Sequence, residues 1–474
     1  MDPFVFRIRN PFGMMTPPAA TPRRRRPPGT LCLVSLGCAK NQVDSELMLG
    51  RLRQAGWVLT ERPEDAQVIV VNTCSFIEDA AQESLETILE LARYKKSGSC
   101  RRLVVTGCLP ERYREKIVPE LPEVDLFLGT GALDRIVEAV GDRTGAPKAI
   151  LPDPDTLAVG SLNAERVLTS PHTAYLKIAE GCDRGCTFCI IPRLRGRQKS
   201  RPPEDILAEG RDLVDRGVKE LNLVAQDTTH YGRDLDPPVP LAALLHHLAG
   251  ACGGARREGL WIRVLYGHPE SIDEAFIRAV AALPAVCPYF DLPIQHASDR
   301  VLRRMGRNYT RQGLRRLFRR IREIVPDACL RTTVITGFPG ETEHDFQQVL
   351  DFAEEIRFDH LGAFVYSDAE DLPSHRLPNA VPRETAQERY DRLLSLQLDI
   401  AAEKNQRHIG RRMTVLIEED LGNGMFSGRT ALQAPEVDGV TYVQARAGVR
   451  LPLGGFVAAH IRDVMEYDLL AEAP

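Results

Sequence analysis

No uninterrupted apolar run in this sequence approaches the roughly 18 residues that a membrane-spanning helix needs. The first 29 residues also contain no apolar core of the kind that defines a secretory signal peptide, although four arginines stand at 23–26. We therefore expect a cytoplasmic protein with no membrane attachment, in which residues 1–29 form a disordered tail. An arm that contacts RNA through its arginines is the alternative for this tail.

A strong excess of charge of either sign is also missing. The chain of 474 residues has 61 Lys or Arg and 65 Asp or Glu, which gives a net charge of −4. Composition therefore gives no general reason to expect binding to nucleic acid. The eleven cysteines are an odd number scattered over a large protein, which argues against the disulfide framework of a secreted domain. Metal binding or burial has to account for them.

The length is too great for one hydrophobic core and predicts about three domains. The first begins near residue 30, where short β-branched runs alternate with helical segments, a pattern that favours βαβ units in a parallel sheet. Three of these runs, 31–38, 66–74 and 101–108, each end on a cysteine.

These strand-end cysteines are Cys38, Cys74 and Cys108. Ligands bind beyond the carboxyl ends of the strands in an open α/β sheet, so we expect the three thiols to converge in space. The alternative is that small cysteines are simply buried at strand ends.

A segment rich in Gly, Pro and Asp at 141–170 is expected to be a linker. Six further strand-like runs, separated by helical patterns, follow it. Six βα units are fewer than the eight of a closed barrel, so we expect a partial (β/α)6 barrel. Polar residues at its strand ends are expected at the carboxyl rim, where such folds keep their active sites: Gln226, Asp227, Gln295 and His296.

The last part of the chain, 406–474, consists of short alternating runs broken by Gly, Asn and Pro. This pattern predicts a small five-stranded β-barrel. Residues 410–474 contain six Arg or Lys and nine Asp or Glu, a net charge of −3. A surface of that sign binds phosphates poorly and suits a basic protein partner better.

The stretch EGCDRGCTFCIIP, residues 180–192, places Cys182, Cys186 and Cys189 within eight residues. Thiolates suit zinc, Cu(I) or iron–sulfur clusters. No second CxxC pair exists, although a zinc ribbon would contain one. A [4Fe-4S] cluster generally takes four thiolates, so three leave one iron open for a substrate or cofactor.

This CxxxCxxC motif at the end of a first barrel strand, with Phe188 before the last cysteine, resembles the radical S-adenosylmethionine (SAM) superfamily. The resemblance implies that Cys182, Cys186 and Cys189 hold a [4Fe-4S] cluster whose open iron chelates SAM. It also implies that an electron cleaves SAM to methionine and a 5′-deoxyadenosyl radical, which abstracts hydrogen from carbon. Phe188, Gln226 and Gln295 are candidates for lining the SAM site.

The whole arrangement, with GFPGETE at 337–343, resembles the methylthiotransferases from about residue 30 to the end. The resemblance implies a second [4Fe-4S] cluster on Cys38, Cys74 and Cys108, where sulfur is methylated and transferred, and two molecules of SAM per turnover. The implied domains are an N-terminal methylthiotransferase α/β (Rossmann-like) domain, a radical-SAM partial TIM barrel and a TRAM-like β-barrel, at 30–140, 171–405 and 406–474.

The family has two branches, one that modifies an aspartate of small-subunit ribosomal protein number twelve and one that modifies an N6-isopentenyl or threonylcarbamoyl adenosine of tRNA. The segments 177–202, 226–232, 289–307 and 330–343 look like the ribosomal-protein branch. The RNA branch typically has Asn at the position of Asp227 and Ser-Gly at that of His296 and Ala297. We therefore expect methylthiolation of the aspartate β-carbon, with no nucleic acid as the direct substrate.

We expect a monomer that binds this ribosomal protein or the small subunit and accepts electrons from a donor such as flavodoxin or ferredoxin. A non-catalytic ribosome- or RNA-binding metalloprotein and a radical-SAM enzyme of another reaction type are the alternatives.

Ten arginines between 300 and 322 predict a solvated helix face, with contact to RNA as the alternative. Five other cysteines are expected to serve packing or to lie in loops: Cys32, Cys100, Cys252, Cys287 and Cys329.

Overall fold

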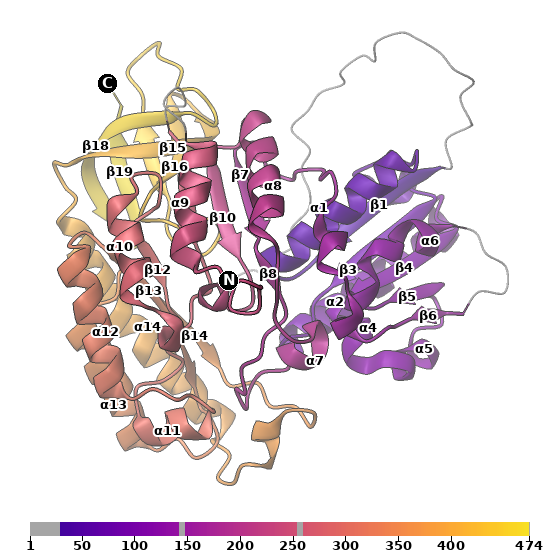
Figure 1. The fold of residues 1–474 in the computed structure, drawn as a ribbon, viewed down its shortest axis with the longest axis horizontal. Coiled ribbons are helices and arrows are strands. Elements are labelled where there is room, and N and C mark those ends of the chain that lie inside the picture. The colour runs from indigo at the N-terminus through magenta and orange to yellow at the C-terminus, as the bar shows by residue number, and fades with distance from the viewer. Residues whose placement is uncertain (1–28, 142–146, 254–258, 474) are drawn as a thin grey trace. The chain divides into compact units, whose positions relative to one another are not determined.

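The computed structural model describes residues 29–141, 147–253 and 259–473. The tail expected at 1–29 therefore lies, except for Gly29, outside the described residues. The chain divides into two compact units (Figure 1). The first contains the chain up to Pro171 with Ala179–Arg184 and Cys189–Arg201, and the second contains His172–Ile178, Gly185–Phe188 and the chain from Pro202 onward.

A parallel sheet of six strands, in the order β2-β1-β3-β4-β5-β6, forms the centre of the first unit. The three expected cysteine-bearing strands are β1, β3 and β4, which are neighbours in the sheet. The other three have only two or three residues each, too few to show a periodic pattern. The strands are β1 (Thr30–Ser35), β2 (Val58–Leu59), β3 (Val68–Thr73), β4 (Arg102–Gly107), β5 (Leu126–Leu128) and β6 (Ala149–Ile150).

Side chains alternate across these strands, which gives the sheet two apolar faces. One face, with Ile69 and Val105, packs on Ile88 and Leu91 of α2. Helices α1 and α6 contact each other and the strands of the sheet. The helices and the two short strands that complete this unit are α1 (Ala39–Gln54), α2 (Glu78–Ala92), α3 (Tyr94–Ser97), α4 (Cys108–Tyr113), α5 (Ile117–Glu120), α6 (Ile136–Val140), β8 (Ala179–Glu180), α7 (Ile191–Arg195) and β9 (Lys199–Ser200).

Part of the segment that we expected to be a linker, 141–170, packs on this unit. Strand β6 lies inside it and pairs with β5. Further along, Arg166 Nη2 lies 2.5 Å from Oε2 of Glu46 on α1, and both side chains are buried. The backbone N–H of Thr169 donates to the other carboxylate oxygen of Glu46, at 3.1 Å. These described parts of the segment are held by strand pairing and by polar contacts with Glu46, which composition alone does not reveal.

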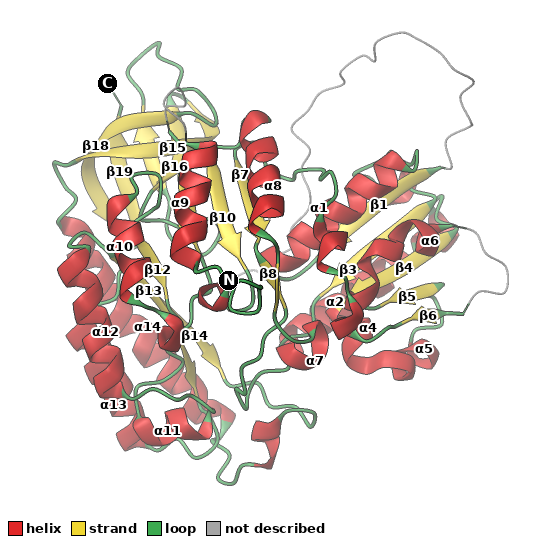
Figure 2. Ribbon diagram, in the orientation of Figure 1, coloured by secondary structure: helices red, strands yellow, loops and turns green. Residues whose placement is uncertain are grey.

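Six parallel strands form the partial barrel of the second unit, as expected. They occur as two sheets, β7-β10-β11 and β12-β13-β14, and a parallel bridge between Ile262 and Val286 connects β11 to the segment before β12. Figure 2 shows the alternation of strands and helices. The strands are β7 (Thr173–Lys177), β10 (Glu220–Val224), β11 (Trp261–Val264), β12 (Tyr289–Asp291), β13 (Cys329–Thr336) and β14 (His360–Val365).

Helix α12 of this unit is amphipathic, with its apolar side chains on one face and its arginines on the other. Leu314, Phe318 and Ile321 are buried at spacings of four and three residues, while Arg316 and Arg319 are exposed. The prediction of a solvated arginine face is therefore confirmed for α12. None of the helices among the described residues is both long and apolar enough to cross a membrane. The helices are α8 (Pro203–Asp215), α9 (Leu241–Cys252), α10 (Glu274–Ala282), α11 (Asp299–Arg304), α12 (Arg311–Ile324), α13 (Glu343–Ile356) and α14 (Arg383–Gln406).

The C-terminal strands close into the expected five-stranded barrel, in the order β15-β16-β17-β19-β18. Its interior is filled by apolar side chains that include Val415, Ile417, Phe426 and Ile461. Alternation of these residues with exposed polar ones is what the sequence pattern indicated. The strands are β15 (Arg412–Gly422), β16 (Met425–Thr430), β17 (Thr441–Gln444), β18 (Phe456–Met465) and β19 (Asp468–Glu472).

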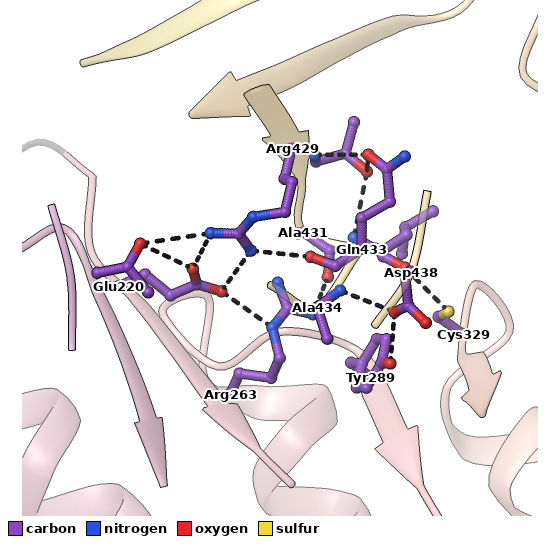
Figure 3. Close-up of polar contacts among 12 residues, drawn as sticks. Glu220, Arg263, Tyr289, Cys329, Arg429, Ala431, Gln433, Ala434 and Asp438 are labelled. Carbon is purple, nitrogen blue, oxygen red and sulfur yellow. Dashed lines mark hydrogen bonds and ion pairs between the residues drawn. The ribbon is translucent and has the colours of Figure 1, made fainter. Parts of the chain in front are cut away.

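The small barrel and the partial barrel belong to one unit and share buried polar contacts (Figure 3). The phenol of Tyr289 on β12 donates to Asp438 Oδ2 at 2.6 Å. The ring of Trp261 on β11 packs against Phe456 on β18, with centroids 4.7 Å apart. These contacts hold the small barrel on the amino-terminal side of the strands, since Trp261 begins β11 and Tyr289 begins β12.

Candidate functional site

Cys38, Cys74 and Cys108 follow the carboxyl ends of three neighbouring parallel strands. Cys38 precedes α1, Cys74 follows β3 directly, and Cys108 begins α4. Because β1, β3 and β4 are adjacent and parallel, their ends open at one edge of the sheet. The thiols of Cys38 and Cys108 are close enough to Cys74 to affect its ionisation. The structure therefore brings together the three cysteines that sequence reasoning grouped, which we call the three-cysteine site.

Two glycines make this close approach possible. Gly37 has a φ of +89°, and a Cβ there would lie 2.6 Å from the Cβ of Cys74. Gly107 has a φ of +97°, and a Cβ there would lie 2.5 Å from the carbonyl oxygen of Thr73. A side chain at either position would push the strand-end loops apart.

Two buried amides fix the loops that carry the cysteines. Asn41 Nδ2 donates to the carbonyl oxygens of Leu36 and Thr73, at 3.0 and 2.9 Å. Asn72 Nδ2 donates to the carbonyl oxygen of Asn41 at 2.9 Å. These bonds connect the end of β3 with the start of α1, so the positions of Cys38 and Cys74 depend on each other.

Sequence reasoning missed a further member of this site, the buried side chain of Arg195. Its Nη2 lies 3.7 Å from the Cys108 sulfur, and its Nη1 donates to Asp44 Oδ2 at 2.6 Å. Nη2 also donates to Asn41 Oδ1, and Glu180 Oε1 lies 3.5 Å from Nη1. No local signal marks this arginine, because its partners on α1 are more than 150 residues away.

The charges around the site act on its thiols in different directions. Burial raises the pKa of Cys38, but the positive charges of Lys40 and Arg195, together with hydrogen bonds from the backbone of Asn41 and Lys40, bring that pKa below the usual value. Burial, together with the neighbouring thiols of Cys108 and Cys38, raises the pKa of Cys74 to about 12. Burial also raises the pKa of Cys108, against the opposing charge of Arg195. The two cations favour the thiolate form that an iron ligand requires.

The first and last cysteines of the CxxxCxxC motif belong to the same unit as the three-cysteine site. Cys182 is buried, and its backbone N–H donates to the carbonyl oxygen of Gly196 at 3.0 Å. Gly181 has a φ of +81°, and a Cβ there would lie 2.0 Å from the carbonyl oxygen of Arg197. Cys189 is half-buried. The segment before Cys182 is thus held directly against the segment that follows Cys189.

The middle of the motif belongs to the second unit. Thr187 Oγ1 donates to the carbonyl oxygen of Arg304 at 2.8 Å. The ring of Phe188 meets that of Phe338, from the GFPGETE segment, edge to face with centroids 6.4 Å apart. The guanidinium of Arg307 lies over the Phe188 ring, 5.5 Å from its centroid. Phe188 is therefore held in place by an aromatic ring and a cation.

The polar residues expected at the rim lie just beyond their strands. Gln226 follows β10, and Gln295 follows β12 with a φ of +64°. Both are half-buried.

Their neighbours Asp227 and His296 make contacts within the rim. Asp227 accepts a hydrogen bond from Thr229 Oγ1 at 2.9 Å. The fully buried His296 accepts from the backbone N–H of Ser298 at 2.9 Å and lies 3.4 Å from Glu341 Oε2. These two side chains thus stabilise the rim locally.

The remaining cysteines fit the packing role predicted for them. All five are buried: Cys32, Cys100, Cys252, Cys287 and Cys329.

Among the residues that the structure describes, no three Cys, His, Asp or Glu side chains are grouped so that they could hold one metal ion. Thiolates that hold a [4Fe-4S] cluster each bind a separate iron, so they need not meet at one point. Three soft donors, of which Cys74 and Cys108 are buried and Cys38 is half-buried, fit such an anionic cluster with two cations beside them.

Three family models match the chain: "Uncharacterized protein family UPF0004" at residues 30–129, "Radical SAM superfamily" at 176–353 and "TRAM domain" at 409–473. Among solved structures, the radical S-adenosylmethionine methyltransferase TsrM from Kitasatospora setae is similar, with a TM-score of 0.52 and 13% identity. The similarity covers 79% of this chain and 90% of that one. At this identity it supports the fold only.

Relatives named "Ribosomal protein uS12 methylthiotransferase RimO" match almost the whole chain. The protein of Desulfosudis oleivorans is 53% identical over 442 residues, which cover 93% of this chain and 99% of that one. The protein of Geobacter sulfurreducens is 45% identical over 445 residues, which cover 93% and 97% of the two chains. On this similarity, the chain belongs to the RimO family of ribosomal protein uS12 methylthiotransferases.

Proposed function

We propose that this chain attaches a methylthio group to the β-carbon of an aspartate in ribosomal protein uS12. The proposal rests on the 53% identity, over 93% of the chain, to a uS12 methylthiotransferase. The geometry supports it, because the structure gathers Cys38, Cys74 and Cys108 at one edge of a sheet, as a second cluster site requires.

The proposed ligands are two sets of three cysteines. Cys182, Cys186 and Cys189 would hold a [4Fe-4S] cluster that binds SAM, and the three-cysteine site would hold a second one. When bound, the two clusters and two molecules of SAM per turnover supply the electron, the hydrogen-abstracting radical and the methylated sulfur. The chain contributes soft thiolates and, at the three-cysteine site, the positive charges of Lys40 and Arg195.

Phe188, Gln226 and Gln295 are proposed to line the SAM site. Gln226 and Gln295 follow the carboxyl ends of two parallel strands, the edge at which barrels of this kind bind their ligands. Phe188 adjoins the motif cysteines in sequence and is held by Phe338 and Arg307.

Domain boundaries at 30–140, 171–405 and 406–474 are supported by the ranges of the three family models.

The acidic C-terminal barrel is proposed to contact the basic ribosomal protein, free or within the small subunit. We further propose that the protein acts as a monomer in the cytoplasm and receives its electrons from a flavodoxin or ferredoxin.

Mass spectrometry of uS12 and of bulk tRNA, from cells with and without this chain, tests the function. We expect the methylthio group on the uS12 aspartate to be absent from cells that lack this chain and to be restored when the wild-type protein is supplied. Complementation with Cys108→Ala should fail, whereas Cys32→Ala, which changes a buried cysteine outside the site, should restore the modification. A methylthio group that disappears from a tRNA adenosine instead would show that the proposed substrate is wrong.

A further inference from the structure

We propose that Arg195 is a positioning residue of the three-cysteine site, whose guanidinium donates a hydrogen bond to the Cys108 sulfur and raises the reduction potential of the cluster held there. The inference rests on the proposed function, which assigns Cys38, Cys74 and Cys108 as ligands. Arg195 is not among the ligands or the SAM-lining candidates that the proposed function assigns.

The geometry of the contact is specific. Nη2 of Arg195 lies 3.7 Å from the Cys108 sulfur, within the range of an N–H···S hydrogen bond. The arginine is 5% exposed and Cys108 is 6% exposed, so water screens this contact little. A cation buried this close to a ligand sulfur interacts with it more strongly than an exposed cation would, although Asp44 and Glu180 offset part of its charge.

The guanidinium is aimed at the sulfur by three other groups. Asn41 and Asp44 stand one turn apart on α1, the helix that begins immediately after Cys38, and both accept from it. Glu180 Oε1 lies 3.5 Å from Nη1. Because a guanidinium is planar, these partners determine where its remaining N–H points. A lysine ammonium could keep the charge but could not make the same set of bonds.

These contacts also join the motif to the site. Arg195 lies six residues after Cys189, and Glu180 lies two residues before Cys182. The segments on both sides of the CxxxCxxC motif therefore meet at one guanidinium that touches Cys108. The spacing of the motif gives no hint of this connection.

The chemical consequence concerns reduction by one electron. A [4Fe-4S] cluster held by thiolates gains negative charge when it is reduced, and hydrogen bonds to the sulfurs set its potential. A cationic donor on Cys108 stabilises the reduced form more than the oxidised form. Loss of Arg195 should therefore make the cluster harder to reduce.

The test uses the full chain with Cys182, Cys186 and Cys189 changed to Ala, so that the three-cysteine site alone binds a cluster after reconstitution with iron and sulfide. A redox titration with dithionite, followed by electron paramagnetic resonance, gives the midpoint potential. We compare Arg195→Lys with the double variant Arg195→Gln/Asp44→Asn, which removes both members of the buried pair. Arg193→Gln, on the exposed side of the same helix, is the matched control.

We expect the double variant to shift to a more negative potential, so that less than half of its cluster is reduced at the midpoint of the parent protein. Arg195→Lys should shift in the same direction by less, and Arg193→Gln should not shift. If the double variant binds no cluster, the midpoint potential of Arg195→Lys tests the inference alone. Unchanged potentials in the Arg195 variants would overturn this inference alone. A parent protein that binds no cluster would overturn the ligand assignment of the proposed function as well.

Discussion

Arg429 of the C-terminal barrel and Glu220 of the partial barrel form a buried ion pair, with Nη2 of the arginine 2.5 Å from Oε2 of the glutamate (Figure 3). Arg263 Nε donates to the other oxygen of Glu220 at 2.9 Å, and Glu418 Oε1 lies 2.7 Å from Arg429. Arg429, Glu220 and Arg263 are buried. Charges of both signs are thus paired within the contact between the two barrels.

Arg429→Ala is expected to destabilise the attachment of the small barrel by about 3–5 kcal/mol. The carboxylate of Glu220 would stay buried, with Arg263 in place of two arginines to balance its charge. Urea unfolding followed by tryptophan fluorescence measures this loss of stability. Trp57→Phe leaves Trp261 as the fluorescent tryptophan, and Trp261 reports on the small barrel because it contacts Phe456. The control is Arg462→Ala, which breaks a pair with Glu472 in which both side chains are more than half exposed. It should cost less than about 1 kcal/mol. Equal effects of the two substitutions would contradict the importance of the buried pair.

His408, buried between α14 and β15, should make stability depend on pH. Burial, reinforced by the charges of Arg407 and Arg411, lowers its pKa from 6.5 to about 4. Between these values the unfolded chain binds a proton that the folded chain does not, so stability is lost as pH falls from about 6.5 to about 4. Urea unfolding across this range should show the loss, and His408→Gln should reduce its slope. His246→Gln, at an exposed position on α9, should leave the slope as it is.

Gly37→Ala should damage the three-cysteine site. The new Cβ would stand 2.6 Å from the Cβ of Cys74, at a φ of +89° that disfavours any side chain. With the three motif cysteines changed to Ala, iron analysis after reconstitution should show that Gly37→Ala has lost most of its iron. The control is Gly250→Ala in α9, where a Cβ would meet nothing within 4 Å. Full iron content in Gly37→Ala would mean that Cys74 is not a ligand or that the loop adjusts freely.

Much of this architecture could be predicted from patterns that span few residues. β-branched runs and helical periods indicated the strands of both α/β units and the closed C-terminal barrel. The position of Cys38, Cys74 and Cys108 at successive strand ends was enough to group them, because parallel strands open at one edge. The short strands β2, β5 and β6 escaped prediction, since two or three residues carry no period.

The buried charges could not be predicted in this way. Arg195 pairs with Asp44 across 151 residues, Arg166 with Glu46 across 120 and Arg429 with Glu220 across 209. Nothing in the residues beside these arginines marks them as buried. A charge remains buried only where an opposite charge or a hydrogen-bond partner compensates the loss of water. Residue type and spacing therefore mark the cysteines of the candidate sites, whereas the path of the folded chain selects which arginines are buried and paired.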